Sequence, residues 1–201
     1  MVVEVHFFSL DVDPARFVAL LTPDERERAA RFRFDVHRNR YVVCRGRLRE
    51  LLGADQPFLY GAHGKPYWEG EIAFNVSHSH DVGMIAIGRG IELGCDVERV
   101  DPKFVDDQIP ERFFSPGEVR ALRALPKPEQ TAAFFRIWTR KEAVIKACGL
   151  GVSMGLDTFD VTLDEPARIL RGAAGLTLKS VEAPDGFMAA VAARGEFTVK
   201  Q

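Results

Sequence analysis

The chain has 201 residues, of which 46% are hydrophobic and 28% are charged, and its formal net charge is −2. This composition predicts a water-soluble globular protein with one sizeable core or two small ones. The near-zero net charge excludes a bulk electrostatic attraction to nucleic acid.

The cysteines and the apolar segments indicate the compartment. The three cysteines form no CxxC pair, which argues against a thiolate metal site or a disulfide framework and fits a reducing cytoplasm. No apolar run reaches the roughly 18 residues of a transmembrane helix, and the N-terminus lacks the layout of a signal peptide. We therefore expect a cytoplasmic protein with no membrane contact.

The first half of the chain predicts helices followed by an antiparallel meander. A capping box begins one helix at Thr22-Pro23-Asp24-Glu25, with threonine as N-cap and proline in the first helical position. A longer helix ends at Gly53, where a positive φ is favoured. The expected elements are a strand over 2–8, helices over 13–21, 22–32 and 36–52, a loop over 61–70, strands over 72–76 and 82–87 around a polar turn at 77–81, and a strand over 91–98.

The second half repeats this order. Ser115-Pro116-Gly117-Glu118 has the capping layout of the first half, and the long helix that follows ends at Gly149. Further strands are expected near 158–163, 176–182 and 187–193. We therefore predict an α+β fold of two pseudo-duplicated subdomains, residues 1–100 and 101–201, each an antiparallel sheet packed with helices.

Positive charge is concentrated in one stretch. Between Arg26 and Arg49 there are nine arginines against two acids, Glu27 and Asp35. One interpretation is a solvated basic helix face. The other is a surface that meets phosphate or an acidic partner, because the guanidinium fork matches phosphate oxygens.

The long second-half helix carries three residues that share one side. Trp138, Glu142 and Lys146 are spaced i, i+4 and i+8. The simpler interpretation is a surface Glu–Lys pair that contributes roughly 0.2–0.5 kcal/mol. The alternative is a carboxylate and an ammonium that face a ligand.

Two more carboxylates project from one face of the strand over 91–98. Asp96 and Glu98 are i, i+2, so like charges lie close together, which is costly unless a positive charge lies between them. Solvation at a strand edge would explain the pair, and so would Mg²⁺, which prefers oxygen ligands and substrate phosphates. Glu142 would be a third carboxylate if the long helix packs beside this strand.

Polar residues around 63–80 suit phosphate better than nucleophilic catalysis. Ser77-His78-Ser79-His80 offers hydroxyls and imidazoles, but no nucleophile elbow surrounds it and no acid is fixed to orient a histidine. A polar turn and a phosphate contact both remain open. Lys65, between Gly64 and Pro66, lies on a stiff loop suited to a fixed cationic contact.

These signals occur together in one known family. Gly94-Cys95-Asp96-Val97-Glu98 resembles the G-x-D-x-E motif of the 4′-phosphopantetheinyl transferases, and the stretch from Trp138 to Lys146 resembles their W-[ST]-x-K-E-[AS]-x-x-K motif. Three further family motifs are resembled by residues 63–66, 74–79 and 113–118. The match covers essentially the whole chain, and its two halves are similar to the Sfp-type class, in which one chain holds two similar subdomains.

The resemblance implies a reaction and its metal. The 4′-phosphopantetheine group of coenzyme A would pass to a serine of an apo acyl or peptidyl carrier protein, with release of adenosine 3′,5′-bisphosphate. Mg²⁺, or alternatively Mn²⁺, would be held by Asp96, Glu98 and Glu142. Glu142 would also act as the base for the serine, and Lys146 would lie near the phosphates, so that both are expected catalytic residues together with Asp96.

The resemblance also implies the coenzyme A contacts and the place of the site. His78 and Arg38 would lie toward the 3′-phosphate, and the site would lie in the cleft between the subdomains of a monomer. Glu25 stands where some members have a basic residue, which puts contacts in its helix in doubt. The expected coenzyme A contacts are Arg28, Arg38, Lys65, Ser77, His78, Lys141 and Lys146.

Other functions remain compatible with the sequence. One is a non-catalytic module that binds coenzyme A or an acidic carrier domain, and another is a Mg²⁺-dependent phosphoryl-transfer enzyme with a different acceptor. A further hypothesis is an apolar surface for the carrier helix, with burial between the halves as the equal alternative. That surface would consist of Phe104, Val105, Ile109, Phe113 and Phe114.

Overall fold

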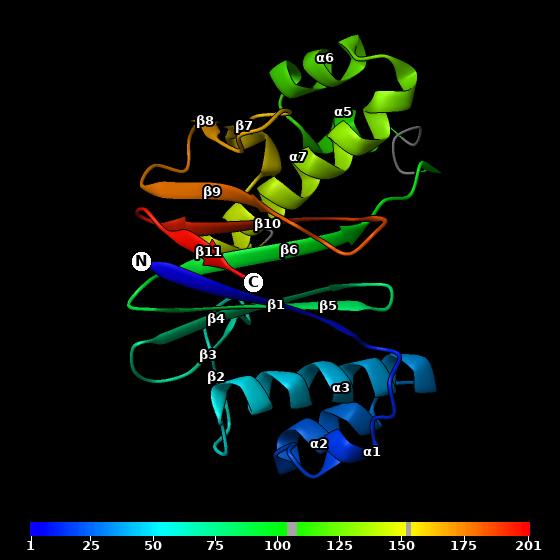
Figure 1. Cartoon of the computed structure of the whole chain (residues 1–201), viewed down its shortest axis with the longest axis vertical. Helices are drawn as coiled ribbons and strands as arrows, with labels where there is room; N and C mark the ends of the chain where they lie inside the picture. The colour runs from blue at the N-terminus through cyan, green and yellow to red at the C-terminus, as the bar shows by residue number, and fades with distance from the viewer. Residues whose placement is uncertain (104–107, 152–153) are drawn as a thin grey trace.

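The computed structural model describes residues 1–103, 108–151 and 154–201. Two sheets lie at the centre of the molecule, and helices cover the outer face of each (Figure 1). This mixture of helices and mostly antiparallel strands confirms the predicted α+β class. Within the described ranges, no helix is both long and apolar enough to cross a membrane.

The first sheet has the strand order β11-β1-β5-β4. It consists of β1 (Val2–Ser9), β4 (Ile72–Ser79), β5 (Val82–Arg89) and β11 (Thr198–Lys200). Its helices are α1 (Ala15–Val18), α2 (Pro23–Ala30) and α3 (Asp35–Leu52), and a small hairpin is formed by β2 (Leu59–Tyr60) and β3 (Pro66–Tyr67). As predicted, α3 ends at Gly53, whose φ of 61° is one that glycine adopts easily.

The second sheet has the order β6-β10-β9. Its strands are β6 (Leu93–Arg99), β9 (Leu176–Val181) and β10 (Phe187–Arg194). The long helix α7 (Lys127–Cys148) packs against this sheet and ends at Gly149, at a φ of 69°. The remaining elements are α5 (Ile109–Phe113), α6 (Pro116–Ala124), η2 (Leu156–Thr158), β7 (Asp160–Val161) and β8 (Ile169–Arg171).

Two strands pair with strands from the other side of the predicted boundary at residue 100. β6 pairs with β10 in the second sheet, and β11 pairs in parallel with β1 in the first, with Val2 opposite Thr198. Each sheet therefore contains a strand from the other half of the chain. The division into residues 1–100 and 101–201 stays a prediction. The sequence pattern did not indicate that the two halves exchange strands.

Side chains join the two sheets where the edge strands β4 and β6 meet, a line that we call the seam. The Cys95 N–H donates to Asn75 Oδ1 at 2.9 Å, and the Cys95 thiol donates to the Asn75 carbonyl. The hydroxyls of Ser77 and Ser79 donate to carboxylates of β6. Ser77 to Ser79 were expected in a turn. They extend strand β4 instead, because β6 supplies partners for their hydroxyls.

Both predicted capping boxes form, and each has a buried ion pair beneath it. Glu25 accepts from the Thr22 N–H and also from the Arg49 guanidinium, at 2.6 Å. Glu118 accepts from the Ser115 N–H and pairs with the Lys141 ammonium at 2.8 Å. The acidic residue at position 25 therefore has a structural partner, which explains its presence in an arginine-rich segment.

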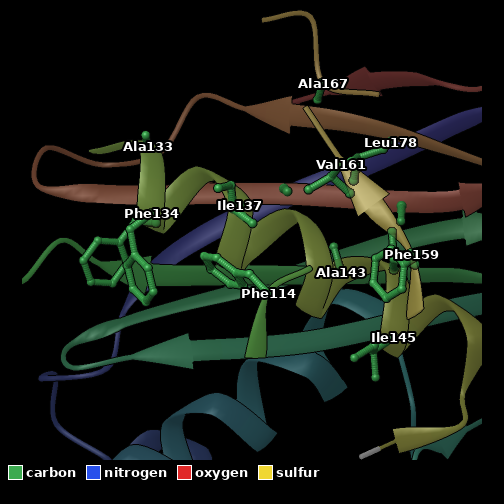
Figure 2. Packing of buried hydrophobic residues seen from close by; sticks show 14 of the residues in the cluster. Phe114, Ala133, Phe134, Ile137, Ala143, Ile145, Phe159, Val161, Ala167 and Leu178 are labelled. Atoms are coloured by element: carbon green, nitrogen blue, oxygen red, sulfur yellow. The ribbon is translucent and has the colours of Figure 1, made fainter. Parts of the chain in front are cut away.

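The core of the second half surrounds α7 (Figure 2). Phe114 and Phe134 lie in it, and Trp138 stacks on Phe134 with ring centroids 5.8 Å apart. Phe114 is only 3% exposed, which supports burial over a docking surface at that residue. Phe104 and Val105, which belong to the same hypothesis, lie outside the described residues.

Candidate functional site

Gly94 brings α7 directly against β6. A Cβ atom at this position would lie 2.2 Å from the Ala147 nitrogen and 2.3 Å from the Ala143 carbonyl oxygen. Any side chain would therefore push the helix backbone away from the strand. The close approach places Glu142 and Lys146 of α7 beside the carboxylates of β6, as the sequence predicted on the condition that the two elements pack together.

Lys146 and Asp96 form an ion pair at the seam. The ammonium lies 2.7 Å from Asp96 Oδ1 and 3.0 Å from the Ser77 hydroxyl. Burial opposes the positive charge, but the Asp96 carboxylate reverses this effect and the pKa of Lys146 is raised. The second oxygen of this carboxylate, Asp96 Oδ2, is buried and has no hydrogen-bond partner.

Glu98 and Glu142 complete a cluster of negative charge. Burial raises the pKa of Glu98 to about 7, and repulsion from Asp96 and Glu142 acts in the same direction, while the Ser79 hydroxyl, 2.6 Å from Glu98 Oε2, opposes it. Burial also raises the pKa of Glu142, again with repulsion from Asp96. The Lys146 ammonium lowers both pKa values, but it does not offset the effect of burial.

The carboxylates of Asp96, Glu98 and Glu142 fit a hard cation if substrate phosphates and water complete its coordination shell. Among the residues that the structure describes, no three His, Cys, Asp or Glu side chains are grouped closely enough to hold a metal ion by themselves. The Lys146 ammonium already occupies one oxygen of Asp96. However, Mg²⁺ commonly uses one or two carboxylates and completes its shell with substrate phosphates and water. The unpartnered Asp96 Oδ2 and the raised pKa values of Glu98 and Glu142 fit this mode.

A cavity of about 530 Å³, which we call the α7 cavity, lies on one side of the cluster. Its charged lining residues are Lys65, Arg112, Glu142, Lys146 and Asp157. Most of its lining is apolar or glycine. Its apolar side chains are Pro66, Val76, Phe113, Ile145, Met154 and Leu156.

A second cavity of about 470 Å³, which we call the basic cavity, lies against α3. Pro66 and Val76 line both cavities, so the two adjoin. Adjacent side chains of a strand point to opposite faces of the sheet. Ser77 of β4 therefore contacts β6, whereas His78 lines the basic cavity. Partial burial lowers the pKa of His78, and Lys146 acts in the same direction. The polar lining of this cavity is Arg28, His37, Arg40, Tyr41, Arg45, His78 and His80.

The basic cavity also contains donors without partners. Tyr41 Oη and Arg45 Nη1 are buried and make no hydrogen bond. Sequence reasoning missed both residues, together with His37 and Arg40. The signal was present, because positions 37, 41, 45 and 48 follow helical period.

The predicted coenzyme A contacts separate into three groups. Arg28 and His78 line the basic cavity, and Lys65 and Lys146 line the α7 cavity, while Ser77 bonds to Asp96. Arg38 lies outside both linings and pairs with Asp35 at 3.0 Å on the surface.

Lys141 is removed from both cavities. Its ammonium is fully buried, and it pairs with Glu118 and donates to the carbonyls of Leu156 and Phe159. These three partners use all three N–H donors of the ammonium, which leaves none for a cofactor. We therefore assign Lys141 to the core in place of the expected cofactor contact.

Most of the arginine-rich stretch is neutralised by acids. Six of its nine arginines lie within ion-pair distance of a carboxylate, so the stretch is largely a paired surface. Arg28 is not one of these six. Its guanidinium lies over the Tyr41 ring and borders the basic cavity, which Arg40 and Arg45 also line.

The fold and the site define an α+β protein with a carboxylate–lysine cluster beside one of two adjoining cavities. The family model of the 4′-phosphopantetheinyl transferase superfamily matches residues 92–190. The chain is 35% identical to the 4′-phosphopantetheinyl transferase HetI of Nostoc sp. over 96% of this chain and 88% of HetI. It is 33% identical to the 4′-phosphopantetheinyl transferase Sfp of Bacillus subtilis over 85% of this chain and 74% of Sfp.

A solved structure, the holo-[acyl-carrier-protein] synthase of Thermotoga maritima, aligns with a TM-score of 0.39 at 17% identity, over 52% of this chain and 63% of that one. The sequence relatives carry the assignment. The chain belongs to the 4′-phosphopantetheinyl transferase superfamily and is an enzyme of its Sfp-type class, which confirms the predicted resemblance.

Proposed function

We propose that this enzyme transfers the 4′-phosphopantetheine group of coenzyme A to a serine hydroxyl of an apo acyl or peptidyl carrier protein and releases adenosine 3′,5′-bisphosphate. The observation that carries the proposal is the arrangement of two adjoining cavities, one basic and one largely apolar, beside a carboxylate–lysine cluster. Coenzyme A has a matching layout, with an anionic nucleotide at one end, a pyrophosphate in the middle and a pantetheine arm at the other end.

The basic cavity suits the nucleotide end. Arg28, Arg45 and His78 offer cationic or neutral N–H donors to phosphate, and Arg45 Nη1 has no partner within the protein. Charge-assisted bonds from guanidinium to phosphate are among the stronger hydrogen bonds in proteins. The α7 cavity then takes the pantetheine arm along Phe113, Ile145 and Leu156.

The cluster beside the α7 cavity suits the chemical step. The serine oxygen attacks the phosphorus that carries pantetheine, and the bond from that phosphorus to the bridging oxygen breaks. The electron pair of the broken bond stays on the leaving adenosine bisphosphate. The Lys146 ammonium offsets negative charge that develops on the phosphates. Glu142 accepts the serine proton, and its raised pKa makes it a better base than an ordinary glutamate.

Asp96 and Glu98, with Glu142 beside them, would hold Mg²⁺ or Mn²⁺ together with the pyrophosphate. A bound cation of this kind would supply Lewis-acid polarisation of the phosphoryl oxygens.

Residues of a single chain line both cavities of the site. The basic cavity is lined largely by α3, and the α7 cavity by α7 with the segments beside it. We therefore propose that the monomer is active. The three cysteines are free, which supports a cytoplasmic location.

The intact mass of an apo carrier protein tests this function directly. The carrier would be incubated with the enzyme and coenzyme A, with and without Mg²⁺, and with Asp96→Asn as the variant. We expect a mass increase of one phosphopantetheine group that needs both Mg²⁺ and Asp96. If several unrelated carriers gain no mass while coenzyme A still binds, the chain is a binding module. Transfer to a different acceptor would identify another phosphoryl-transfer reaction.

A further inference from the structure

Lys65 connects three separate elements of the site. It lies in the loop of the β2–β3 hairpin, and its ammonium donates to the carbonyl oxygens of Leu93 at 2.8 Å and Lys146 at 2.7 Å. Leu93 begins β6, and Lys146 lies in the last turn of α7. One side chain therefore connects the hairpin, the strand with the carboxylates and the helix with the catalytic lysine.

The Lys146 carbonyl is a favourable acceptor for a cation. The last four carbonyls of a helix have no intrahelical partner, and the C-terminal end of the helix carries partial negative charge. An ammonium at this point satisfies one of these carbonyls and interacts favourably with the helix dipole.

The contact lies at the closest approach of α7 to β6. Leu93 is next to Gly94, the position at which the helix backbone touches the strand, and Lys146 is next to Ala147, which lies opposite that glycine. On the other side of the same helix turn, the Lys146 side chain reaches Asp96 and Ser77. The Lys65 contact therefore acts on the backbone that places this ammonium.

We propose that Lys65 is a positioning residue, whose ammonium ties the last turn of α7 to β6 and thereby fixes the Lys146–Asp96 pair. The inference rests on the proposed function, and it differs from the coenzyme A contact that the family resemblance implies for this lysine. The two carbonyls take two of its three N–H donors. The effect of Lys65 on the reaction is then indirect, through the position of Lys146.

The two roles predict different kinetics. Loss of a positioning residue lowers kcat, because a displacement of about 1 Å at the reacting groups costs between about 10- and 100-fold in rate. Loss of a coenzyme A contact weakens ground-state binding and raises KM and Kd for coenzyme A. A positioning residue also acts in the absence of the ligand, whereas a ligand contact does not.

The experiment compares Lys65→Met and Lys65→Gln with Lys179→Met. Lys179 is a matched control, because it is a partly buried lysine on β9 whose ammonium lies over the Phe197 ring, outside both cavities. Three quantities are measured for each variant: kcat and KM by carrier mass, Kd for coenzyme A by calorimetry, and amide hydrogen exchange over residues 143–151 in the free protein. Thermal unfolding shows which variants are folded. If Lys65→Met does not fold, the comparison uses Lys65→Gln alone.

We expect both Lys65 variants to lower kcat at least tenfold, to keep Kd for coenzyme A within about threefold, and to speed exchange over 143–151. The control should change none of the three. A tenfold or larger rise in Kd would overturn the proposal, whatever happens to kcat, and so would unchanged kcat and exchange. If the wild-type enzyme transfers nothing, the proposed function fails, while the exchange rates still decide whether Lys65 holds the end of α7.

Discussion

The two halves of the molecule share one structural device. In each half, a capping-box glutamate at the start of a short helix receives a basic side chain from the long helix: Arg49 of α3 reaches Glu25, and Lys141 of α7 reaches Glu118. All four side chains are at most 3% exposed. The long helices lie on opposite outer sides of the paired sheets (Figure 1).

The halves differ in what each long helix presents to the adjoining cavities. α3 places Tyr41 and Arg45 in the basic cavity, whereas α7 places Glu142 and Lys146 beside the α7 cavity. The buried ion pairs are therefore the common scaffold, and the proposed site residues are other side chains of the same two helices. An ion pair in the sequence does not reveal by itself whether it belongs to the scaffold or to the site. Exposure distinguishes the two lysines in the structure, because Lys141, paired with Glu118, is fully buried and Lys146, paired with Asp96, is 28% exposed.

Among variants of the three ion pairs, the largest expected effect on activity belongs to Lys146→Met. Loss of one fixed charge that stabilises developing negative charge typically lowers kcat by about 10²–10³-fold. We expect a loss of this size in carrier modification, while Lys179→Met retains wild-type kcat. A Lys146→Met enzyme with normal kcat would show that the pair with Asp96 is structural, like the two buried pairs.

Arg49→Met tests the scaffold side of the comparison. Removing Arg49 leaves the buried Glu25 carboxylate with Arg45, whose Nε lies 3.5 Å away, as its remaining ion-pair partner, and should cost about 3–5 kcal/mol in free energy of unfolding. Urea denaturation measures this loss. Adding Glu25→Gln to the same protein should recover part of it, because glutamine keeps the capping box and removes the charge. No recovery would mean that packing around Arg49, and not the buried charge, carries the stability.

The requirement for Mg²⁺ should depend on pH through Glu98. With a pKa of about 7, this carboxyl is protonated below pH 7 and charged above it. A cation competes with the proton, so the half-saturating Mg²⁺ concentration should rise about tenfold per pH unit below pH 7 and level off above it. Measuring it from pH 5.5 to 8.5 checks this, and Glu98→Gln should give a shallower dependence. Equal slopes in the two proteins would place the titrating group elsewhere.

The smallest expected effect belongs to Arg38→Ala. Arg38 is paired with exposed Asp35 outside both cavities, so Kd for coenzyme A should stay within about twofold. Arg45→Met is the comparison, because its unpartnered Nη1 borders the basic cavity, and loss of a charged hydrogen bond should weaken binding about tenfold or more. Calorimetry measures Kd for coenzyme A in both variants. A larger loss of affinity in Arg38→Ala than in Arg45→Met would support the sequence-based expectation for Arg38.

Local sequence signals predicted the local structure well. The two capping boxes, the ends of α3 and α7 at Gly53 and Gly149, and the shared face of Asp96 and Glu98 follow from residue types at fixed spacings. The helix expected over 13–21 is shorter, since only Ala15–Val18 is helical. The packing of Glu142 beside β6 could be stated only as a condition, because it depends on contact between distant segments.

The missed features are non-local. The pairing of β11 with β1 joins residues 198–200 to residues 2–4, and no local pattern encodes that partner. Lys141 lies next to Glu142 in the motif, yet α-helical geometry turns adjacent side chains about 100° apart and buries one of them. Arg40 and Arg45 were hidden among other arginines, because the sequence alone does not show which guanidinium borders a cavity.

The most direct test of this account is Glu142→Gln, measured for both carrier modification and unfolding. The raised pKa of Glu142 means that its charge destabilises the folded protein at pH 8, above the ordinary glutamate pKa. We predict that the variant loses about 10²–10⁴-fold in transfer rate, as expected for a missing general base, while its free energy of unfolding at pH 8 is unchanged or higher. A variant that is less stable and still transfers phosphopantetheine at the wild-type rate would contradict the account, because Glu142 would then belong to the scaffold.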